Sequence, residues 1–539
     1  MLRLLTAIFI TALALLAASN SLKPKSNEPQ FQTSDRCMAC HNSLVDSSGD
    51  DISIGFHWRA SIMANSSRDP YWQASSRREV MEHPESQAHI EDDCSVCHMP
   101  IPRYESKLRG KPGEIFTNLP LSTDDELHRH ASDGVTCSVC HQVAKDKLGT
   151  RDSFNGGFVV HGPDEDGRHS EYGPFTIQAG LQTIMRSSTE GYKPEQSLHI
   201  RDSEVCATCH TLYTDALAPG GKVVGTLAEQ MPYPEWLHSD YRNKVSCQGC
   251  HMPAIDGAVQ VSRVLGEQRE GTRLHSFIGG NFFMLQMLDR YRGELSVAAL
   301  PTELSANAQA TSQFLATRAA TLAIENIAAT GSQLQADIVI HNKTGHKLPS
   351  AFPSRRVWLH LLVRDHNGRI VFESGAINPD GSIVGNDNDA DPTKYEPHYT
   401  EIRNRDQVEI YESILGDPND HVTTGLLAAS KYLKDNRLLP DGFDKQTADK
   451  DIEVVGNARN DSAFIGGSHR VRYIASLGNA GGPFTVEAEL WYQPIGYRWA
   501  NNLKLYDTAP EPLRFNGYFD SMQSNTGAVL ARATATAAN

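Results

Sequence analysis

A Cys-x-x-Cys-His motif constrains this chain more than any other feature. It occurs five times, and the five copies use all ten cysteines. The cysteine pairs are Cys37 with Cys40, Cys94 with Cys97, Cys137 with Cys140, Cys206 with Cys209, and Cys247 with Cys250. The histidines that follow them are His41, His98, His141, His210 and His251. This spacing is the attachment signal of a c-type haem, in which two thiols add to the vinyl groups and the next imidazole ligates the iron.

Structural zinc, disulfides and redox-active CxxC pairs are the alternatives for such cysteines. None of them requires a histidine after every second cysteine, and here it follows five times in five. We therefore expect five covalently bound haem c groups, with the ten thiols as attachment points and the five histidines as iron ligands.

The N-terminus reads as a secretory signal over residues 1–19. Arg3 supplies the positive charge, residues 4–16 the apolar stretch, and Ala17-Ala18-Ser19 a small-residue cleavage zone. The apolar stretch is short for a bilayer span, so cleavage is favoured over an uncleaved membrane anchor. These features predict a periplasmic or secreted protein that contacts a membrane only if the signal stays in place. Residues 20–36 are polar and predict a flexible lead.

Charge and composition narrow the range of partners. The net charge of −15 argues against nucleic acid and favours redox partner proteins, while self-assembly stays open. The hydrophobic fraction of 39% is low for a globular chain, and bound porphyrins would supply part of the missing apolar surface.

The pattern of the chain predicts an α+β multidomain protein. A mostly helical and irregular five-haem domain is expected over 37–300, and a connecting helix over 301–322. Alternating runs separated by turn signals then predict an immunoglobulin-like antiparallel β-sandwich over 323–530. A helix is expected at 425–435 and a disordered tail at 531–539. The strands are expected at 333–341, 357–363, 369–373, 408–414, 469–476 and 484–492.

A weak internal repeat is visible in the haem region. A CxxCH motif is followed by Trp-x-x-Ser at Trp58 and then by CxxCH-Met-Pro, and the same order recurs around Trp236. Duplication of a two-haem unit explains this order, and convergence on similar loops is the alternative.

The second axial ligand decides what each haem can do, because a six-coordinate iron carries electrons and a five-coordinate iron can bind a small molecule. His130 and His199 lie just upstream of haem motifs, and His275 follows the last one. His57 and Met63 flank the first Trp-x-x-Ser segment. His161 and His238 are lesser candidates, and for all of these positions a surface or structural side chain is the alternative.

Two segments resemble a known class. Trp58-x-x-Ser61 after the first CxxCH, and Ser203-x-x-Cys-Ala-x-Cys-His, are similar to segments of the multihaem cytochromes that include the tetrahaem cytochromes of ammonia oxidisers and hydroxylamine-oxidoreductase-like proteins. That resemblance covers about the first half of the chain. It implies a histidine ligand two places after the serine, but Met63 stands there in the first copy and Tyr241 in the second. The CxxCK variant of nitrite reductases is absent.

The second half adds two candidate sites. The turn Gly345-His346-Lys347-Leu348-Pro349 could offer His346 to a haem, or it is a solvent loop. Asp387, Asp389 and Asp391 alternate in a loop and could hold Ca²⁺. The glycine and the distal glutamate of an EF-hand are missing, so a solvated acidic loop is favoured.

Together these features predict an exported pentahaem electron-transfer protein that docks or assembles through its β domain. A catalytic residue independent of haem is not evident, and an electron carrier is favoured over a substrate-converting enzyme. The alternatives are an oxidoreductase of a small nitrogen or sulfur compound at one five-coordinate haem, with Arg355, Arg356 or Tyr241 as proton donors, and a subunit of an extracellular electron conduit.

Overall fold

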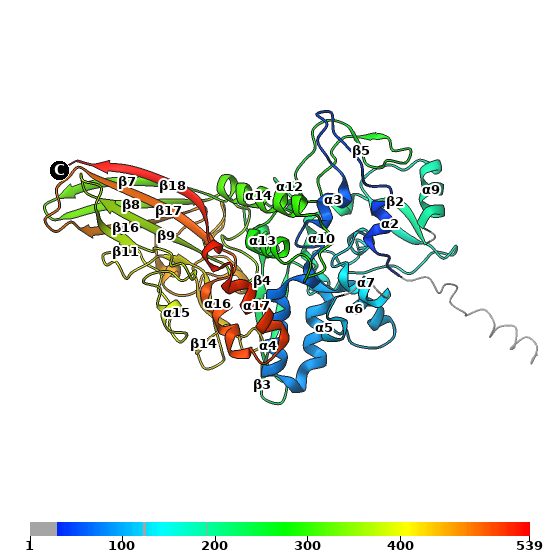
Figure 1. The fold of residues 1–539 in the computed structure, drawn as a ribbon, viewed down its shortest axis with the longest axis horizontal. Helices are drawn as coiled ribbons and strands as arrows, with labels where there is room; N and C mark the ends of the chain where they lie inside the picture. The colour runs from blue at the N-terminus through cyan, green and yellow to red at the C-terminus, as the bar shows by residue number, and fades with distance from the viewer. Residues whose placement is uncertain (1–29, 122–125, 190, 539) are drawn as a thin grey trace, which may run out of the picture.

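A computed structural model describes residues 30–121, 126–189 and 191–538. A half of short helices and loops lies at one end of an elongated molecule and a half of long strands at the other (Figure 1). The expected signal and most of the expected lead fall outside the described residues. Among the described residues, none of the helices combines the length and the apolar character needed to cross a bilayer.

The first half contains short helices that carry or support the CxxCH motifs. Glycine, proline and polar loop residues separate these helices, as expected where loops are built around cofactors. The helices are α2 (Ser34–Met38), α3 (Ile54–Arg59), α4 (Pro70–Glu82), α5 (Gln87–His98), α6 (Pro100–Leu108), α7 (Glu126–Ser132), α8 (Cys137–His141), α9 (Ala179–Thr189), α10 (Ser203–Ala207), α11 (Pro232–Leu237), α12 (Cys247–His251) and α13 (Phe282–Arg290). Short strands pair as β1 (His169–Gly173) with β2 (Tyr192–Gln196), β3 (Leu212–Ala218) with β4 (Lys222–Gln230), and β5 (Val259–Gln260) with β6 (Gln268–Arg269).

Helix α14 (Pro301–Arg318) connects the halves and leads directly into β7 (Ala320–Thr330). Pro301 occupies the first helical position, where its missing N–H costs no hydrogen bond. Glu303 then closes the helix start, because its carboxylate accepts the amide of Leu300 at 3.0 Å.

Two large sheets and a smaller one, β14-β13-β15, form the second half. One large sheet has the order β10-β9-β17-β18, and β12 also pairs with β9; the other has the order β11-β16-β8-β7. Alternate residues of β16 and β17 are buried, as expected for strands with one face on a core. The strands are β8 (Gln333–Asn342), β9 (Arg356–Arg364), β10 (Ile370–Ser374), β11 (Glu401–Ile402), β12 (Ile410–Tyr411), β16 (Ser468–Ser476), β17 (Phe484–Gln493) and β18 (Ala528–Ala537).

The two large sheets share one apolar core and so form a sandwich. Val471 and Tyr473 of β16 belong to the same buried cluster as Val486 and Leu490 of β17. The sheet orders resemble the A-B-E-D and C-F-G orders of immunoglobulin-like sandwiches, with β10 added beside β9, but β11 runs parallel to β16 over only two residues. The fold class α+β is therefore confirmed, while the immunoglobulin-like assignment stays a prediction.

Two expectations for the β half are wrong. Residues 531–537 are not a disordered tail, because β18 pairs with β17 from Ala528 to Ala537. Residues 425–435 are not a helix: β15 (Lys431–Asp435) pairs with β13 (Ser413–Gly416), which also pairs with β14 (Val422–Thr423). Contacts to the haem half override the helical composition there, since Glu79 accepts the amides of Leu426 and Leu427.

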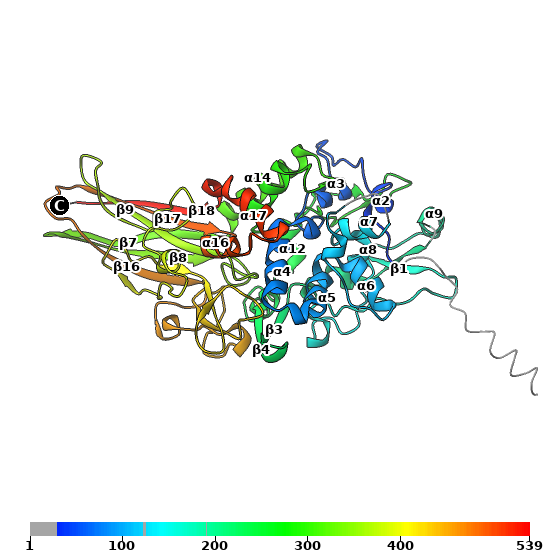
Figure 2. The same cartoon turned by 60° about the horizontal axis from the view of Figure 1, so that its bottom comes forward.

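An apolar contact joins the halves. Helix α17 (Pro510–Asp520), which follows α16 (Tyr497–Asn502), lies beside α4 in both ribbon views (Figures 1 and 2). The ring of Phe515 packs 5.2 Å from that of Tyr71, and Phe519 packs 5.8 Å from Phe283 of α13. The sandwich is therefore packed against the haem half, so its loops can supply side chains to that half.

Candidate functional site

All five CxxCH motifs lie in the helical half, on α2, α5, α8, α10 and α12 or at their ends. The ten cysteines expected to attach haem are all free thiols. Thioether attachment requires thiols that are not oxidised to disulfides, so they fit haem attachment, which stays a prediction for each of them. They are Cys37, Cys40, Cys94, Cys97, Cys137, Cys140, Cys206, Cys209, Cys247 and Cys250.

The second cysteine of the first motif, Cys40, lies outside a helix. Helix α2 ends at Met38, and Cys40 lies in the turn that follows it. Its amide donates to the carbonyl of Cys37 at 3.1 Å, and its carbonyl accepts the amide of Arg263 at 2.8 Å. Both contacts use the backbone, so the half-buried Cys40 thiol keeps its sulfur for attachment.

The histidines of four motifs share one orientation. The Nδ1 of His41 faces the carbonyl of Val261 at 2.5 Å, and the other three make the same kind of contact. The partners are Ser66 for His98 at 3.0 Å, Tyr172 for His141 at 2.6 Å, and Ile278 for His251 at 2.5 Å. An Nδ1–H that donates to a carbonyl leaves Nε2 as the ligating nitrogen, which is the orientation an iron ligand needs.

Burial keeps these imidazoles neutral. It lowers the pKa of His98 and of His251 to about 4, and it also lowers the pKa of His41 and His141. A neutral imidazole is the form that binds a metal. The indole of Trp72 also stacks on the His98 ring, with centroids 4.3 Å apart and planes 1° from parallel, and so fixes its orientation.

Two of these histidines face a second imidazole. The ring centroids of His141 and His275 are 6.5 Å apart at an interplanar angle of 19°. Those of His251 and His346 are 6.3 Å apart at 3°. An iron about 2 Å from each of two Nε2 atoms would place ring centroids roughly 6 Å apart, so both pairs fit an iron between them.

His275 and His346 also share the hydrogen bonding of the motif histidines. The Nδ1 of His275 faces the carbonyl of Arg273 at 3.1 Å, and that of His346 faces the carbonyl of Lys347 at 2.8 Å. Burial lowers the pKa of His275 to about 3 and lowers that of His346 as well. Both residues therefore present a neutral imidazole toward a motif histidine.

His57 and His199 do not meet the expectation of a free ligating nitrogen. The Nε2 of His199 lies 2.7 Å from the carbonyl of Val143, and its Nδ1 lies 2.6 Å from the hydroxyl of Ser197. The Nε2 of His57 lies 3.0 Å from the carbonyl of Asp51. These backbone contacts engage both Nε2 atoms, and iron ligation by either histidine stays a prediction.

Among the described residues, the remaining candidate ligands have no motif histidine opposite them. His130 is buried with its Nδ1 3.5 Å from a Glu105 carboxylate oxygen, which leaves Nε2 for a ligand. Met63 lies in the turn after α3, where its carbonyl accepts the amide of Val135. Ligation by these two residues stays a prediction. His161 and His238 lie at the surface with Nε2 bonded to Asp146 and to the carbonyl of Asp444.

Contacts between thiols give the order of the motifs in space. The thiols of Cys37 and Cys137 lie close together, as do those of Cys97 and Cys209 and those of Cys206 and Cys247. These contacts and burial raise the pKa of Cys137, Cys97 and Cys206 well above the usual value. The fourth motif therefore touches the second and the fifth. The third motif touches the first, and it approaches the fourth through Cys140 and Cys209.

A buried charge network holds the loop that carries His346. The carboxylate of Glu235 on α11 accepts the amide of Lys347 at 3.1 Å and the hydroxyl of Ser350 at 2.6 Å. Its other oxygen pairs with Arg437 at 2.9 Å. Asp435 completes the network, because it pairs with Lys347 and with Arg437 at 2.7 Å each. Sequence patterns do not signal this network, since its members are spread from residue 235 to residue 437.

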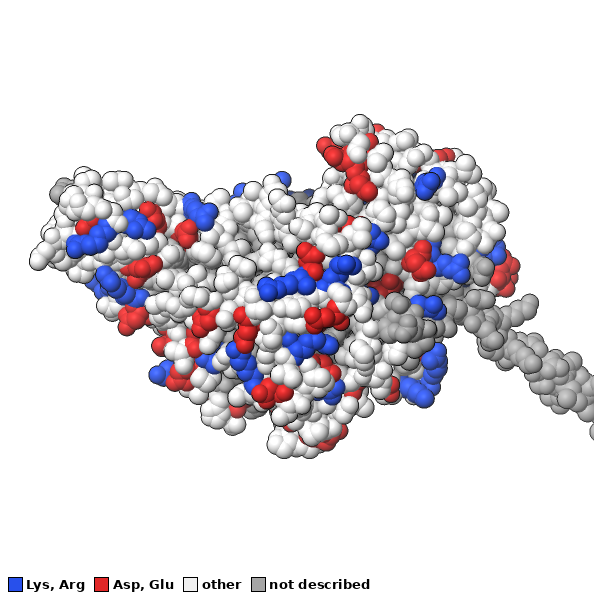
Figure 3. Space-filling view, in the orientation of Figure 1, with Lys and Arg blue, Asp and Glu red and all other residues white. Residues whose placement is uncertain are grey.

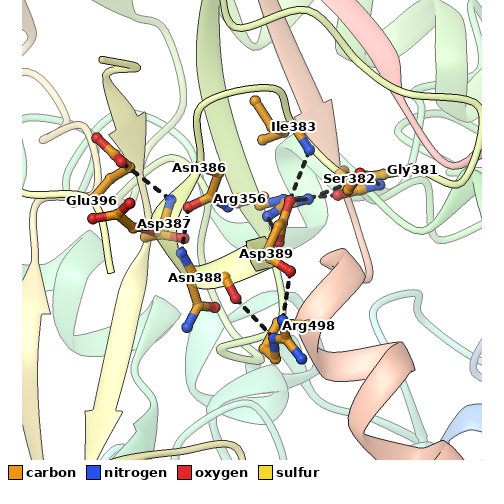
Figure 4. A network of polar contacts seen from close by, with 12 residues as sticks. Arg356, Gly381, Ser382, Ile383, Asn386, Asp387, Asn388, Asp389, Glu396 and Arg498 are labelled. Atoms are coloured by element: carbon orange, nitrogen blue, oxygen red, sulfur yellow. Dashed lines mark hydrogen bonds and ion pairs between the residues drawn. The ribbon is translucent and has the colours of Figure 1, made fainter. Parts of the chain in front are cut away.

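The three residues expected as proton donors have different surroundings. Burial lowers the pKa of His210 and His251, and the charge of nearby Arg355 lowers both values further. Tyr241 donates its hydroxyl to the carbonyl of Lys343 at 3.1 Å. Arg356 is buried in the sandwich, where both its Nη atoms bond Asp389 (Figure 4). Of the three, Arg355 is therefore the one whose charge acts on motif histidines.

The same network engages the carboxylates of the possible calcium site. Asp389 binds Arg356 at 2.8 and 2.9 Å and also accepts the amide of Ile383 at 2.8 Å (Figure 4). Asp391 accepts the amide and hydroxyl of Thr393. The carboxylates of Asp389 and Asp391 thus bind different donors, and among the described residues the ligand atoms of Asp387, Asp389 and Asp391 do not all lie within 4.8 Å of one another.

Replacing Asp389 by asparagine is expected to lower the free energy of unfolding by about 3–5 kcal/mol, because it leaves the buried Arg356 without a counter-charge. Chemical denaturation followed by circular dichroism measures this loss. The control is Glu325→Gln, in an exposed pair with Arg470, which should cost at most about 1 kcal/mol. Addition of Ca²⁺ should leave the denaturant midpoint of wild-type unfolding unchanged. A rise in that midpoint would support a calcium site.

Comparisons with known proteins bear on the fold. No family model matches the chain, and no curated protein matches its sequence. The structure is similar to the crystal structure of a penta-heme cytochrome c552 from Thermochromatium tepidum, with a TM-score of 0.50 and 15% identity. The similarity covers 94% of this chain and 100% of that one, so it spans both halves and shows a shared fold.

Proposed function

We propose that this chain is an exported pentahaem c-type cytochrome that carries electrons, and that His275 and His346 complete the coordination of its third and fifth haems. The observation that carries the proposal is the pair of opposing imidazoles at each of these two motifs. When bound, each haem supplies one-electron chemistry at its iron. The chain supplies the ligands, the burial and the spacing.

The residues around the motifs suit electron transfer rather than substrate binding. Backbone carbonyls hold the motif imidazoles with Nε2 free, and burial keeps them neutral. An iron with imidazoles on both sides has no open position for a substrate. The contacts of the first motif with the third, and of the fourth with the second, third and fifth, would place the cofactors in one connected group that branches at the fourth haem.

The β domain would take part in haem binding directly, because one of its loops would supply His346 as an iron ligand. We also propose that electrons pass to or from a redox partner protein. Acidic and basic side chains are intermingled on the face seen in Figure 3, with no broad patch of one sign over it. A partner on that face would be recognised by shape complementarity and short-range ion pairs rather than by long-range electrostatic attraction.

A second function, conversion of a small nitrogen or sulfur compound, is favoured by one observation at the fourth motif. In the described part of the chain, the ring of His210 has neither a carbonyl partner nor an opposing imidazole, and the charge of Arg355 acts on it. An open position beside a guanidinium suits a small anion. Wild-type protein that binds cyanide or nitric oxide at one haem would support this function, and five inert low-spin haems would exclude it.

The His275→Ala variant tests the electron-transfer proposal. Loss of one imidazole should convert one haem in five to high spin and let it bind cyanide. Electron paramagnetic resonance and the charge-transfer absorption of the oxidised protein measure this change. The exposed His161 gives a matched control, since His161→Ala should leave every haem unchanged. An unaltered spectrum in folded His275→Ala would remove His275 from the iron.

A further inference from the structure

A second group of ligating side chains lies in the β half, outside the CxxCH region. His398 and Glu409 come from the segments before β11 and β12, Asp461 follows the short helix at Asn457–Asn460, and His469 lies on β16. Their exposed fractions are 7%, 0%, 9% and 0%. One ligand atom each of His398, Glu409 and His469 lie within 4.8 Å of one another.

Two imidazole nitrogens of this group meet the same carboxylate oxygen. The Nε2 of His398 and the Nε2 of His469 each lie 3.0 Å from the same oxygen of Asp461, Oδ2. The two rings are nearly parallel, with centroids 4.7 Å apart at 28°. The other oxygen, Oδ1, accepts the amide of Ala463 at 2.8 Å, which turns Oδ2 toward the imidazoles.

The far sides of both imidazoles are also held. The Nδ1 of His398 lies 2.8 Å from a carboxylate oxygen of Glu409, and the Nδ1 of His469 lies 2.8 Å from the hydroxyl of Tyr411. Asn436 donates to the same Glu409 oxygen at 2.9 Å. Imidazoles that bind a metal through one nitrogen commonly donate the other N–H to a carboxylate or another oxygen, so this outer set matches a metal site.

We propose that His398 Nε2, His469 Nε2 and Asp461 Oδ2 bind one divalent transition-metal ion of the zinc class, with water at a remaining position. Ligand atoms about 2.0–2.1 Å from such an ion lie roughly 3 Å apart, which matches the two 3.0 Å spacings. Imidazole with one carboxylate suits zinc better than calcium or magnesium. The ion would tie the segments that carry His398 and Asp461 to the central strand β16.

The charge of the cluster suits a bound cation. Asp461 and Glu409 bring two negative charges, which equal the charge of a divalent ion when both imidazoles are neutral.

Another acidic and histidine group, Glu79, Glu82 and His83, does not qualify. The Glu79 carboxylate accepts two backbone amides, and Glu82 pairs with Arg78 at 3.3 Å. Only one imidazole belongs to this group. Donors already occupy these carboxylates, so a cation would have to displace them.

Zinc binding to the haem-loaded, tag-free protein tests the proposal. After incubation with zinc chloride and dialysis, elemental analysis should find about one zinc per chain, and zinc K-edge absorption, which is blind to haem iron, should show two imidazoles in a nitrogen and oxygen shell at about 2.0–2.1 Å. Absence of retained zinc, or a shell without imidazole, would overturn the proposal and leave a hydrogen-bonded network.

Three variants locate the site. Asp461→Asn should abolish the retention of zinc. Glu409 contacts His398 at Nδ1, on the side away from the proposed ion, so Glu409→Gln should weaken zinc binding about 10–100-fold. His421→Ala removes an exposed histidine that pairs with Asp417 at 3.0 Å and should change nothing. The proposal would be overturned if His421→Ala lost its zinc, or if folded Asp461→Asn kept as much zinc as the wild type. Haem absorbance reports folding in each variant. Should Asp461→Asn not fold, the zinc absorption edge of the wild-type protein alone tests the proposal.

Discussion

Replacing His346 by alanine is expected to convert one haem in five to high spin, although the residue lies in the β half rather than in the haem half. His346 faces His251 at a centroid distance of 6.3 Å, and the two planes differ by 3°. Removing one of two opposing imidazoles empties a coordination position, so the iron should bind cyanide or carbon monoxide and its reduction potential should change. About one fifth of the low-spin signal should be lost.

Two further variants make this test specific. His346→Met restores a ligand atom and should return the haem to low spin at a higher potential. His366→Ala removes an exposed histidine of the same sandwich, bonded to the carbonyl of Gly481, and should leave the spectrum unchanged. Low-spin signals of full size in folded His346→Ala would show that the loop does not reach the iron.

The second large effect is expected from Glu235→Ala. Glu235 and Asp435 balance the buried Lys347 and Arg437, so removal of one carboxylate leaves an uncompensated positive charge in the interior. Breaking a buried pair in this way costs about 3–5 kcal/mol of the free energy of unfolding. Burial opposes ionisation of Asp435, but Arg437 and Lys347 hold its pKa well below the usual range, so Asp435 is ionised at pH 7.

The same variant should also disturb the iron that His346 faces. Glu235 holds the backbone of Lys347 and the side chain of Ser350, which follow His346 in its loop. Urea denaturation measures the stability, and the high-spin signal measures the position of the loop. Glu325→Ala, in the exposed pair with Arg470, is the control and should cost at most about 1 kcal/mol. A stable Glu235→Ala variant with a wild-type spectrum would contradict this role.

Sequence and structure agree where the signal is local. The CxxCH spacing defines its own chemistry, and the alternating pattern of β16 and β17 predicts strands because one face is buried. His275 and His346 are candidates in the sequence, but their partners are not, because each pairing joins residues about 100 or more positions apart. The contact of His199 Nε2 with the Val143 carbonyl, 56 residues away, has no signal in the sequence, and ligation by His199 stays a prediction.

Long-range contacts also explain the errors in the β half. The segment Leu426 to Ala429 has a helical composition, yet its first two amides donate to the Glu79 carboxylate of the haem half. The run of small residues near Thr534 carries little apolar signal, and β18 forms because β17 offers an edge to pair with. The buried network around Glu235 has no sequence signature, since its members are far apart in the chain and the Glu235–Arg437 pair exists only after the two halves pack.

The covalent haem content of the mature protein tests the central claim most directly. Pyridine haemochrome absorbance per chain, with intact mass after acid–acetone extraction, should give five haem groups that resist extraction. Fewer than five, or haem that leaves with the solvent, would contradict a pentahaem protein built on five CxxCH motifs.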